Sequence, residues 1–271
     1  MKSIDSEWVQ SNVYPRQLNG HKKTFGHVFV IAGSKGKAGA AILCARAALH
    51  SGCGLVTAMV PDEAVASLLA ESPELMYLTD KKINEIDLSL FDCIAIGPGL
   101  GVTSESKNIL CYVLENYKGP VVIDADALTL ISSNLQLLSL NHIVTPHPGE
   151  FTRLQGSEYD PLKREDQATA FVKNNQVNLV LKGAQTIVAA ANEPLMINTT
   201  GNDGMATAGT GDVLTGLIAS LCAQGYAPFQ AACIGVYMHG LAGDRAVQSQ
   251  SKASLVASDI IKYLGGIRII D

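Results

Sequence analysis

Short apolar runs alternate along the chain with longer stretches of helix-forming residues, and this alternation restricts the fold more than any other feature. Six runs are rich in β-branched and other apolar residues, and they cover residues 27–33, 54–61, 91–99, 119–126, 142–150 and 178–190. Strands that are apolar throughout and are separated by helices form parallel sheets covered on both faces. The sequence therefore predicts an α/β fold with a mostly parallel central sheet and helices on both sides of it.

The sequence predicts helices most clearly near the start of this pattern and after its end. Residues 39–51 are rich in alanine and stop at Gly52, which is typical of a helix with a glycine terminator. Residues 212–224 place their apolar side chains on one stripe at helical spacing, and two more helices are expected at 228–247 and 253–264. The alanines of the first helix could pack on the sheet or on a neighbouring subunit.

Composition and charge exclude several classes of protein. Hydrophobic residues make up 47% and charged residues 17%, as in folded proteins, and we expect one domain over residues 1–271. The formal net charge of -5 argues against binding to nucleic acid, which requires a basic surface. The chain has no apolar run of about 18 residues and no signal-like start, so we expect a cytoplasmic protein. The six cysteines form no CxxC pair, and most are expected to be buried free thiols.

Glycine-rich and polar segments follow the predicted strands, at the edge where open parallel sheets bind ligands. The most informative is GNDGMATAGTGD, residues 201–212, which leads directly into a predicted helix. Gly209, Thr210 and Gly211 would expose backbone N–H groups to an anion, and the helix dipole favours negative charge there. Asp212 would then be either the N-cap of the helix or a base beside an anion cradle, as phosphoryl transfer to a hydroxyl requires.

Two other loops carry weaker signals. GSKGKAG at residues 33–39 matches neither the P-loop nor the dinucleotide pattern, and alone it would be a glycine-rich turn. TPHPGE at residues 145–150 brings His147 and Glu150 to the end of a strand. Glu150 is a candidate acidic ligand of hydrated Mg²⁺, but both residues would also suit the N-terminus of a helix.

Charged residues end two more predicted strands. Asp124 and Asp126 could order metal-bound water, or they could form a turn and a helix cap. Lys182 could reach a phosphate, or it could lie exposed to solvent. Residues 183–186 would form a hairpin turn that can also present backbone groups to a base or ribose.

The GTGD sequence before a helix resembles the ribokinase-like superfamily, in which the glycines form an anion hole and the aspartate is the catalytic base. Further segments narrow the resemblance to the NAD(P)H-hydrate dehydratase family, and they cover residues 32–56, 96–101, 122–128, 145–151, 181–188 and 201–216. They occur in the order of that family. The resemblance implies a three-layer ribokinase-like fold and a single dehydratase domain, whereas some relatives carry a fused epimerase domain for which this chain is too short.

The resemblance also implies roles for individual residues. Asp212 would be the base, and Gly209, Thr210 and Gly211 would form the anion hole. The hydrate would contact Ala40, Gly101, His147 and Asp212. The nucleotide would contact Lys182, Gly183, Ala184, Gln185, Thr186 and Gly211. Many related kinases have an asparagine in place of His147 within a metal motif, so only Glu150 is retained as a metal-site residue.

The activity that the resemblance implies is repair of hydrated NADH and NADPH, with Mg²⁺ and with ADP or ATP as the co-substrate. Hydroxide is a poor leaving group, and phosphorylation of the ring hydroxyl of the S epimer would convert it into phosphate, a good one. The alternatives are a small-molecule kinase of vitamin salvage and a nucleotide-binding module without turnover. The expected partners are further copies of the chain, as in a tetramer, and a separate epimerase.

Overall fold

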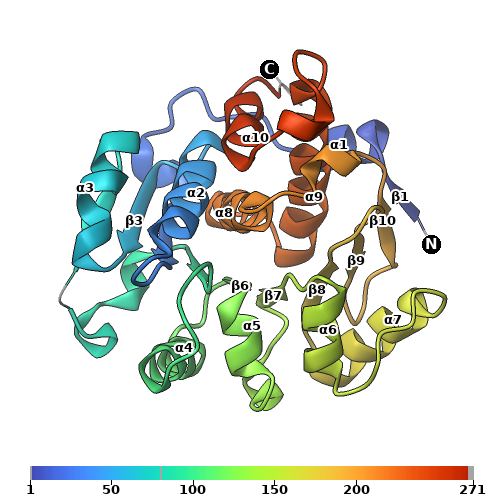
Figure 1. Ribbon diagram of the computed structural model, residues 1–271, viewed down its shortest axis with the longest axis horizontal. Helices are drawn as coiled ribbons and strands as arrows, with labels where there is room; N and C mark the ends of the chain where they lie inside the picture. Colours follow the sequence, from blue (N-terminus) through green and yellow to red (C-terminus); the bar gives the residue numbers. More distant parts are fainter. Residues whose placement is uncertain (1, 80, 268–271) are drawn as a thin grey trace.

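The computed structural model describes residues 2–79 and 81–267, which are built around one ten-stranded sheet (Figure 1). Its strand order is β1-β10-β9-β8-β7-β6-β5-β2-β3-β4. The strands are β1 (Lys2–Ile4), β2 (His27–Ile31), β3 (Leu55–Met59), β4 (Met76–Leu78), β5 (Cys93–Ile96), β6 (Val121–Ile123), β7 (His142–Val144), β8 (Asn178–Leu181), β9 (Ile187–Ala189) and β10 (Met196–Asn198). Neighbouring strands are parallel except that β9 is antiparallel to both β8 and β10. The prediction of a mostly parallel sheet is confirmed.

Helices cover both faces of the sheet, and the three layers are visible in Figure 1. The first face carries α1 (Ser6–Asn12), α2 (Ala38–His50), α3 (Asp62–Glu71), α8 (Thr210–Ala223), α9 (Pro228–Ala246) and α10 (Ala257–Leu264). The second face carries α4 (Ser104–Asn116), α5 (Asp126–Ile131), α6 (Pro148–Gln155) and α7 (Arg164–Asn175). In the first layer, α8 lies between α2 and α9 (Figure 1).

Successive side chains of each central strand pack into opposite hydrophobic layers. In β2, Val28 and Val30 belong to the core under α2 and α8, whereas Phe29 and Ile31 belong to the core on the side of α4 and α5. All four are at most 1% exposed. Burying such a side chain fully is worth about 1.5–3 kcal/mol. A strand covered on both faces therefore has few positions for a polar side chain, which explains the nearly continuous apolar runs in the sequence.

Every predicted strand run contains a strand, but the boundaries and the sheet edges differ from the prediction. The run at 178–190 holds two strands, β8 and β9, joined by the expected hairpin turn at residues 183–186. The three-residue strands β1, β4 and β10 were not predicted. In β1, Ile4 is fully buried and lies opposite Asn198 of β10, so the first residues of the chain are part of the sheet.

The alanines of α2 allow this helix to approach α8 closely. Ala41, Ala45 and Ala48 are fully buried in the layer shared with α8, so they pack within the chain and not on a neighbouring subunit. Gly216 of α8 faces the backbone of α2, since a Cβ atom built at Gly216 would lie 2.0 Å from the carbonyl oxygen of Cys44. This crossing fixes the height and the direction of α8, the helix that begins at the GTGD sequence.

The remaining expectations concern thiols and membranes. All six cysteines are free, and all but Cys111 are buried, as expected from the sequence. Within residues 2–79 and 81–267, no helix has the length and apolar character needed to cross a bilayer.

Candidate functional site

The start of α8 leaves backbone N–H groups without partners inside the helix. Its N-cap is Gly209, which has a left-handed φ of 88° and makes no side-chain capping bond. Leu43 of α2 and Ala257 of α10 lie 2.5 Å and 3.1 Å from the place a Cβ atom would take at Gly209, so only glycine fits this position. The first N–H groups of a helix point along its axis and carry partial positive charge. The anion cradle predicted at residues 209–211 therefore coincides with an open helix N-terminus.

Asp212 is the third residue of α8, and the interpretation of this residue as an N-cap is wrong because Gly209 occupies that position. Burial raises the pKa of the Asp212 carboxyl to about 7. The negative charge of Asp124 raises this pKa further, Lys182 lowers it, and Asp126 raises it slightly. A carboxyl with a pKa near neutrality can accept a proton from a substrate hydroxyl far more readily than an ordinary exposed aspartate can.

Lys182 reaches into the protein from the end of β8. Its backbone N–H donates to the carbonyl of Pro146 at 2.8 Å, which joins the β8–β9 turn to the loop after β7. Its Nζ atom lies 2.9 Å from Oδ1 of Asp124, and the hydroxyl of Thr215 donates to the other oxygen of Asp124 at 2.8 Å. The side chain of Lys182 is only 21% exposed, so the alternative of a solvent-exposed lysine is wrong.

Asp124 and Asp126 point to different partners because the residue between them is unusual. Ala125 has a φ of 49° and a ψ of -120°, which an L residue adopts only under strain. Asp126 begins α5, accepts a hydrogen bond from the N–H of Gly101 at 2.8 Å and pairs with Lys37 at 3.1 Å. Both aspartates thus have fixed protein partners. The interpretation of Asp126 as a helix cap is wrong, because Ala125 occupies the N-cap position of α5 and no side chain caps this helix.

Ala40 and Gly101, the two small residues expected at the hydrate, lie near the ion pair of Lys37 and Asp126. The chain at Gly99 passes close to Ala40, because a Cβ atom built on Gly99 would be 3.0 Å from the Cβ of Ala40. Ala40 is partly exposed, whereas Ala41 is fully buried. Of these two neighbouring alanines, only Ala40 can be touched by a ligand.

His147 and Glu150 form the two halves of a capping box at the start of α6. Nδ1 of His147 accepts from the N–H groups of Gly149 and Glu150, and Oε2 of Glu150 accepts from the N–H of His147 at 2.9 Å. The helix N-terminus predicted as the alternative for these residues is therefore present. The rest of the imidazole ring of His147 is exposed, so the capping role leaves it free to contact a ligand as well.

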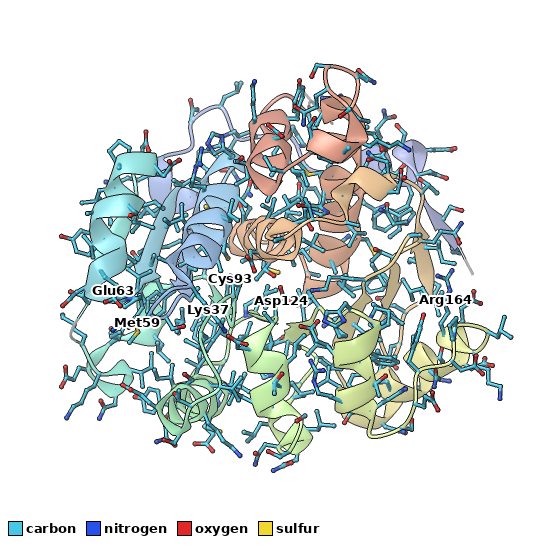
Figure 2. The ribbon with its side chains drawn as sticks, in the orientation of Figure 1. Lys37, Met59, Glu63, Cys93, Asp124 and Arg164 are labelled. Carbon is cyan, nitrogen blue, oxygen red and sulfur yellow. The ribbon has the colours of Figure 1, made fainter. Side chains whose placement is uncertain are left out.

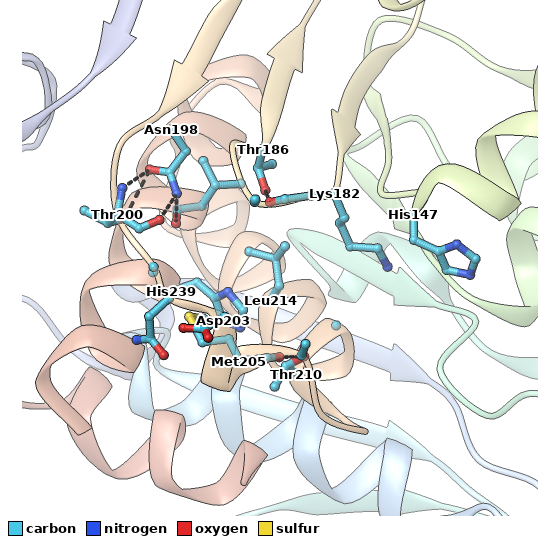
Figure 3. A pocket seen from close by; sticks show the side chains of 18 of the residues that line it. His147, Lys182, Thr186, Asn198, Thr200, Asp203, Met205, Thr210, Leu214 and His239 are labelled. Atoms are coloured by element: carbon cyan, nitrogen blue, oxygen red, sulfur yellow. Dashed lines mark hydrogen bonds between the residues drawn. The ribbon is translucent and has the colours of Figure 1, made fainter. Parts of the chain in front are cut away.

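A cleft of about 680 Å³ extends from the start of α8 across the ends of β8 and β10 (Figure 3). Lys182 and His147 lie on one side of it, and Asn198, Thr200 and His239 lie on the other (Figure 3). Of the predicted site residues, the cleft is lined by His147, Lys182, Gly183, Ala184, Thr186, Thr210 and Gly211. Its volume is in the range of pockets that enclose small ligands.

The other predicted residues lie outside the lining of this cleft. Ala40, Gly101, Gly209, Asp212 and Glu150 are not among its lining residues. Gln185 points away from it and pairs through its side chain with Arg164 of α7 at 3.2 Å. The predicted site residues therefore fall into two groups, those that line the cleft and those, including Ala40 and Gly101, that do not.

Sequence reasoning missed the wall of the cleft that β10 and α9 supply. Val236, His239 and Gly240 come from the middle of α9. The Nε2 atom of His239 is buried without a hydrogen-bond partner among residues 2–79 and 81–267. Burial lowers the pKa of His239 to about 4, so the ring is neutral at physiological pH. A histidine inside an otherwise apolar helical stretch, VYMHGLAG, was the available signal.

The cleft holds few candidates for a protein-bound metal. The described residues contain no group of three or more histidine, cysteine, aspartate or glutamate side chains arranged to hold an ion. Magnesium usually keeps several water molecules and binds through one or two carboxylates together with substrate phosphates. Glu150 fits such a hydrated ion shared with phosphates, and the donor set does not fit a site made of protein ligands alone.

Comparison with known proteins decides between the families that share such a site. A sequence model of the NAD(P)H-hydrate dehydratase family matches residues 28–265. The chain belongs to the NAD(P)H-hydrate dehydratase family. The resemblance noted in the sequence motifs is thereby confirmed over most of the chain.

This chain resembles other proteins of the dehydratase family in both sequence and structure. It is 38% identical to the ADP-dependent (S)-NAD(P)H-hydrate dehydratase of Neisseria meningitidis, over 90% of this chain and 86% of that protein. The ADP/ATP-dependent NAD(P)H-hydrate dehydratase of Bacillus subtilis, co-crystallised with ATP and Mg²⁺, is 32% identical, with a TM-score of 0.87 over 99% of this chain and 97% of that one. A ribokinase-like superfamily protein of Enterococcus faecalis also has a TM-score of 0.87, at 29% identity and over 98% and 94% of the two chains. The ribokinase-like fold is confirmed. The chain spans about half the length of its bifunctional NAD(P)H-hydrate repair relatives.

Proposed function

We propose that this member of the dehydratase family converts the S epimer of hydrated NADH or NADPH back to NADH or NADPH, at the expense of ADP or ATP. The observation that carries the proposal is the pairing of a buried base, Asp212, with the open N-terminus of α8. The family match supports the choice of the hydrate as the substrate. We further propose that the nucleotide occupies the cleft and that the hydrate occupies the side of Ala40 and Gly101.

In the first step, the oxygen of the ring hydroxyl attacks the terminal phosphorus of the nucleotide, and Asp212 accepts the hydroxyl proton. The P–O bond to the rest of the nucleotide breaks, and the N–H groups at residues 209–211 donate to the transferred phosphoryl group. The ring nitrogen then expels phosphate, and loss of a proton from the neighbouring carbon restores the double bond. The nucleotide loses one phosphate and the hydrate loses the elements of water, so the atoms balance.

The chain contributes positioning, charge and proton transfer to these steps. Bound Mg²⁺, carried with the phosphates and held on the protein side through Glu150, would neutralise charge on the nucleotide. Lys182 lies beside Gly211: a Cβ atom built on Gly211 would be 3.3 Å from the Nζ atom of Lys182. Its ammonium group is therefore placed to attract the same phosphates. The neutral ring of His239 offers an unpaired nitrogen to a group of the bound nucleotide.

The proposal predicts that purified protein restores the reduced-nicotinamide absorbance of NADH hydrate only when ADP or ATP and Mg²⁺ are present. The measurement is the absorbance with each nucleotide in turn and with none. The more effective donor identifies the natural co-substrate. If a stable phosphate ester accumulates without recovery of the absorbance, the chain is a kinase and the proposal is wrong.

The proposed division of the site predicts separate effects on the two substrates. Replacing Ala40 with leucine should fill the space next to Gly99 and raise KM for the hydrate at least tenfold, because Ala40 is partly exposed and closely approached by the loop. The affinity for ADP should stay within twofold of the wild-type value, since Ala40 does not line the cleft. Steady-state kinetics and calorimetric titration of ADP would measure both. Equal losses for hydrate and nucleotide would contradict the division.

A further inference from the structure

The ammonium group of Lys182 is held beside the N-terminus of α8 by a chain of side-chain contacts. Its Nζ atom is 2.9 Å from Oδ1 of Asp124, and in this same position it is 3.3 Å from the place of a Cβ atom on Gly211. The hydroxyl of Thr215 donates to Oδ2 of Asp124 at 2.8 Å. Asp124 lies near the centre of the molecule, next to α8 (Figure 2), and Lys182 extends into the cleft from the end of β8 (Figure 3).

Asp124 and Thr215 have little freedom to move. Asp124 is 1% exposed and Thr215 is fully buried, and the backbone N–H of Asp124 donates to the carbonyl of Ile96 in the sheet at 3.1 Å. The hydroxyl of Thr215 also lies 3.1 Å from the carbonyl of Gly211. A hydroxyl carries one proton, and the shorter contact with a charged carboxylate is the stronger one. The bond from Thr215 therefore ties the carboxylate to the helix whose N-terminus forms the cradle.

The ammonium group of Lys182 keeps a donor for a ligand in this position. It has three N–H groups. Asp124 accepts one of them, and Oε2 of Glu150 lies at 3.8 Å, which is an ion-pair distance but too long for a good hydrogen bond. At least one N–H group therefore remains for a phosphate oxygen beside Gly211. A lysine that is already ordered loses less conformational freedom on binding a phosphate than a mobile lysine does.

Asp124 contributes position and not charge to this arrangement. Its Oδ2 atom is 3.7 Å from the place of a Cβ atom on Gly211, so its negative charge repels an anion there and offsets the charge of the ammonium group. What the carboxylate supplies is a fixed place for the lysine donor, and the hydroxyl of Thr215 sets the orientation of the carboxylate.

We infer that Thr215, acting through Asp124, positions the ammonium group of Lys182 for the terminal phosphate of the nucleotide. Thr215 is a positioning residue, because it is fully buried and does not line the cleft. The inference rests on the proposed binding of the nucleotide in the cleft. It adds to that proposal a residue that touches no ligand and acts only through two others.

The test is the affinity for ADP with Mg²⁺, measured by calorimetry in the absence of the hydrate. Thr215→Val has nearly the same shape and lacks the hydroxyl, so it should weaken ADP binding at least threefold. Thr215→Ser keeps the hydroxyl and should bind ADP within twofold of wild type. Both variants leave the charges of Asp124 and Lys182 in place, so a loss confined to valine reports the position of the ammonium group. A loss below threefold in the valine variant, or an equal loss with serine, would overturn the inference.

A double-mutant cycle separates positioning of the lysine from damage to α8. Lys182→Met has no ammonium group to position, so adding Thr215→Val to it should weaken ADP binding less than threefold. A loss of threefold or more that persists in this background means that Thr215 supports the helix itself, and it contradicts the inference. The rise of Tm with ADP concentration extends the measurement to weakly binding variants. If the valine variant does not fold, Thr215→Ala takes its place in both backgrounds.

Ser220→Ala is the matched control. Ser220 is also a fully buried hydroxyl of α8, and its oxygen accepts the N–H of Cys53 at 3.1 Å, far along the helix from the cradle. Its loss should lower Tm and leave the ADP affinity within twofold of wild type. A threefold loss of ADP affinity in this variant would mean that any buried hydroxyl of α8 has the same effect, and the inference would be wrong.

The inference and the proposed function can fail separately. ADP binding is measured without turnover, so a chain that binds ADP but does not restore NADH still tests the role of Thr215. Equal ADP affinities of wild type and Thr215→Val would remove the inference and leave the proposed function intact. Wild-type protein that binds neither ADP nor ATP would remove both.

Discussion

Asp212→Asn is expected to reduce kcat for dehydration by about 10²–10⁴-fold, because the amide cannot accept the hydroxyl proton. The substitution keeps the shape of the side chain at the start of α8, so the protein should fold and bind ADP with an affinity close to that of the wild type. Single-turnover absorbance assays and calorimetry would measure the two quantities. Turnover within tenfold of wild type would remove Asp212 from the mechanism.

The same substitution should stabilise the protein at alkaline pH. The pKa of Asp212 is about 7 in the folded protein and close to the ordinary 3.8 in the unfolded chain, so folding favours the protonated form. Wild-type stability from this group is complete below pH 4 and is lost as the pH rises through 7. Asparagine cannot ionise, and Asp212→Asn should gain at most about 4 kcal/mol over wild type at pH 9 and little at pH 4. Urea unfolding of both proteins at pH 4 and pH 9 would measure this gain in the free energy of unfolding. A gain that does not grow with pH would contradict the raised pKa of Asp212.

Gly216→Ala is expected to destabilise the protein by about 3 kcal/mol and to lower Tm by roughly 6–12 °C. The new methyl group would lie 2.0 Å from the carbonyl oxygen of Cys44 and 3.1 Å from the Cβ of Ala47, and it would force α8 away from α2. Backbone atoms cannot rotate aside as a flexible side chain can. Calorimetric unfolding would measure the change.

Gly39→Ala is the matched control for this prediction. Gly39 lies in α2, is exposed, and has no atom within 4 Å of the position of a new Cβ. Alanine favours a helix over glycine by up to about 1 kcal/mol, so this variant should be as stable as wild type or slightly more so. A similar loss of Tm in both variants would mean that the effect does not arise at the α2–α8 contact.

The fold was largely predictable because its central strands are buried on both faces. That burial leaves a continuous apolar run in the sequence, as in β2 and β5. The edge strands β1 and β4 and the neighbouring strand β10 escape this signal because each has three residues and only partial burial, and MYL or MIN has no distinctive pattern. Their position in the sheet depends on the strand with which each pairs, and the local sequence does not contain this information.

The site was predictable where backbone geometry required particular residues. Gly209 must be glycine for reasons of φ and space, and such positions leave conspicuous motifs. The pKa of Asp212 depends instead on burial and on Asp124, Lys182 and Asp126, which are distant in sequence. His239 likewise acquires its unpaired nitrogen only when α9 closes the cleft. These properties arise from convergence in space, so sequence spacing could not reveal them.

The pairing of the first strand with the tenth has a consequence for synthesis on the ribosome. Ile4 of β1 lies opposite Asn198, and its carbonyl accepts the hydroxyl of Thr199 at 2.8 Å. At about 5–20 residues per second, the ribosome needs roughly 10–40 s to translate the intervening segment. During this time Ile4, fully buried in the finished protein, lacks the strand beside which it pairs. β1 is therefore made long before its pairing partner, and this edge of the sheet can close only late in synthesis.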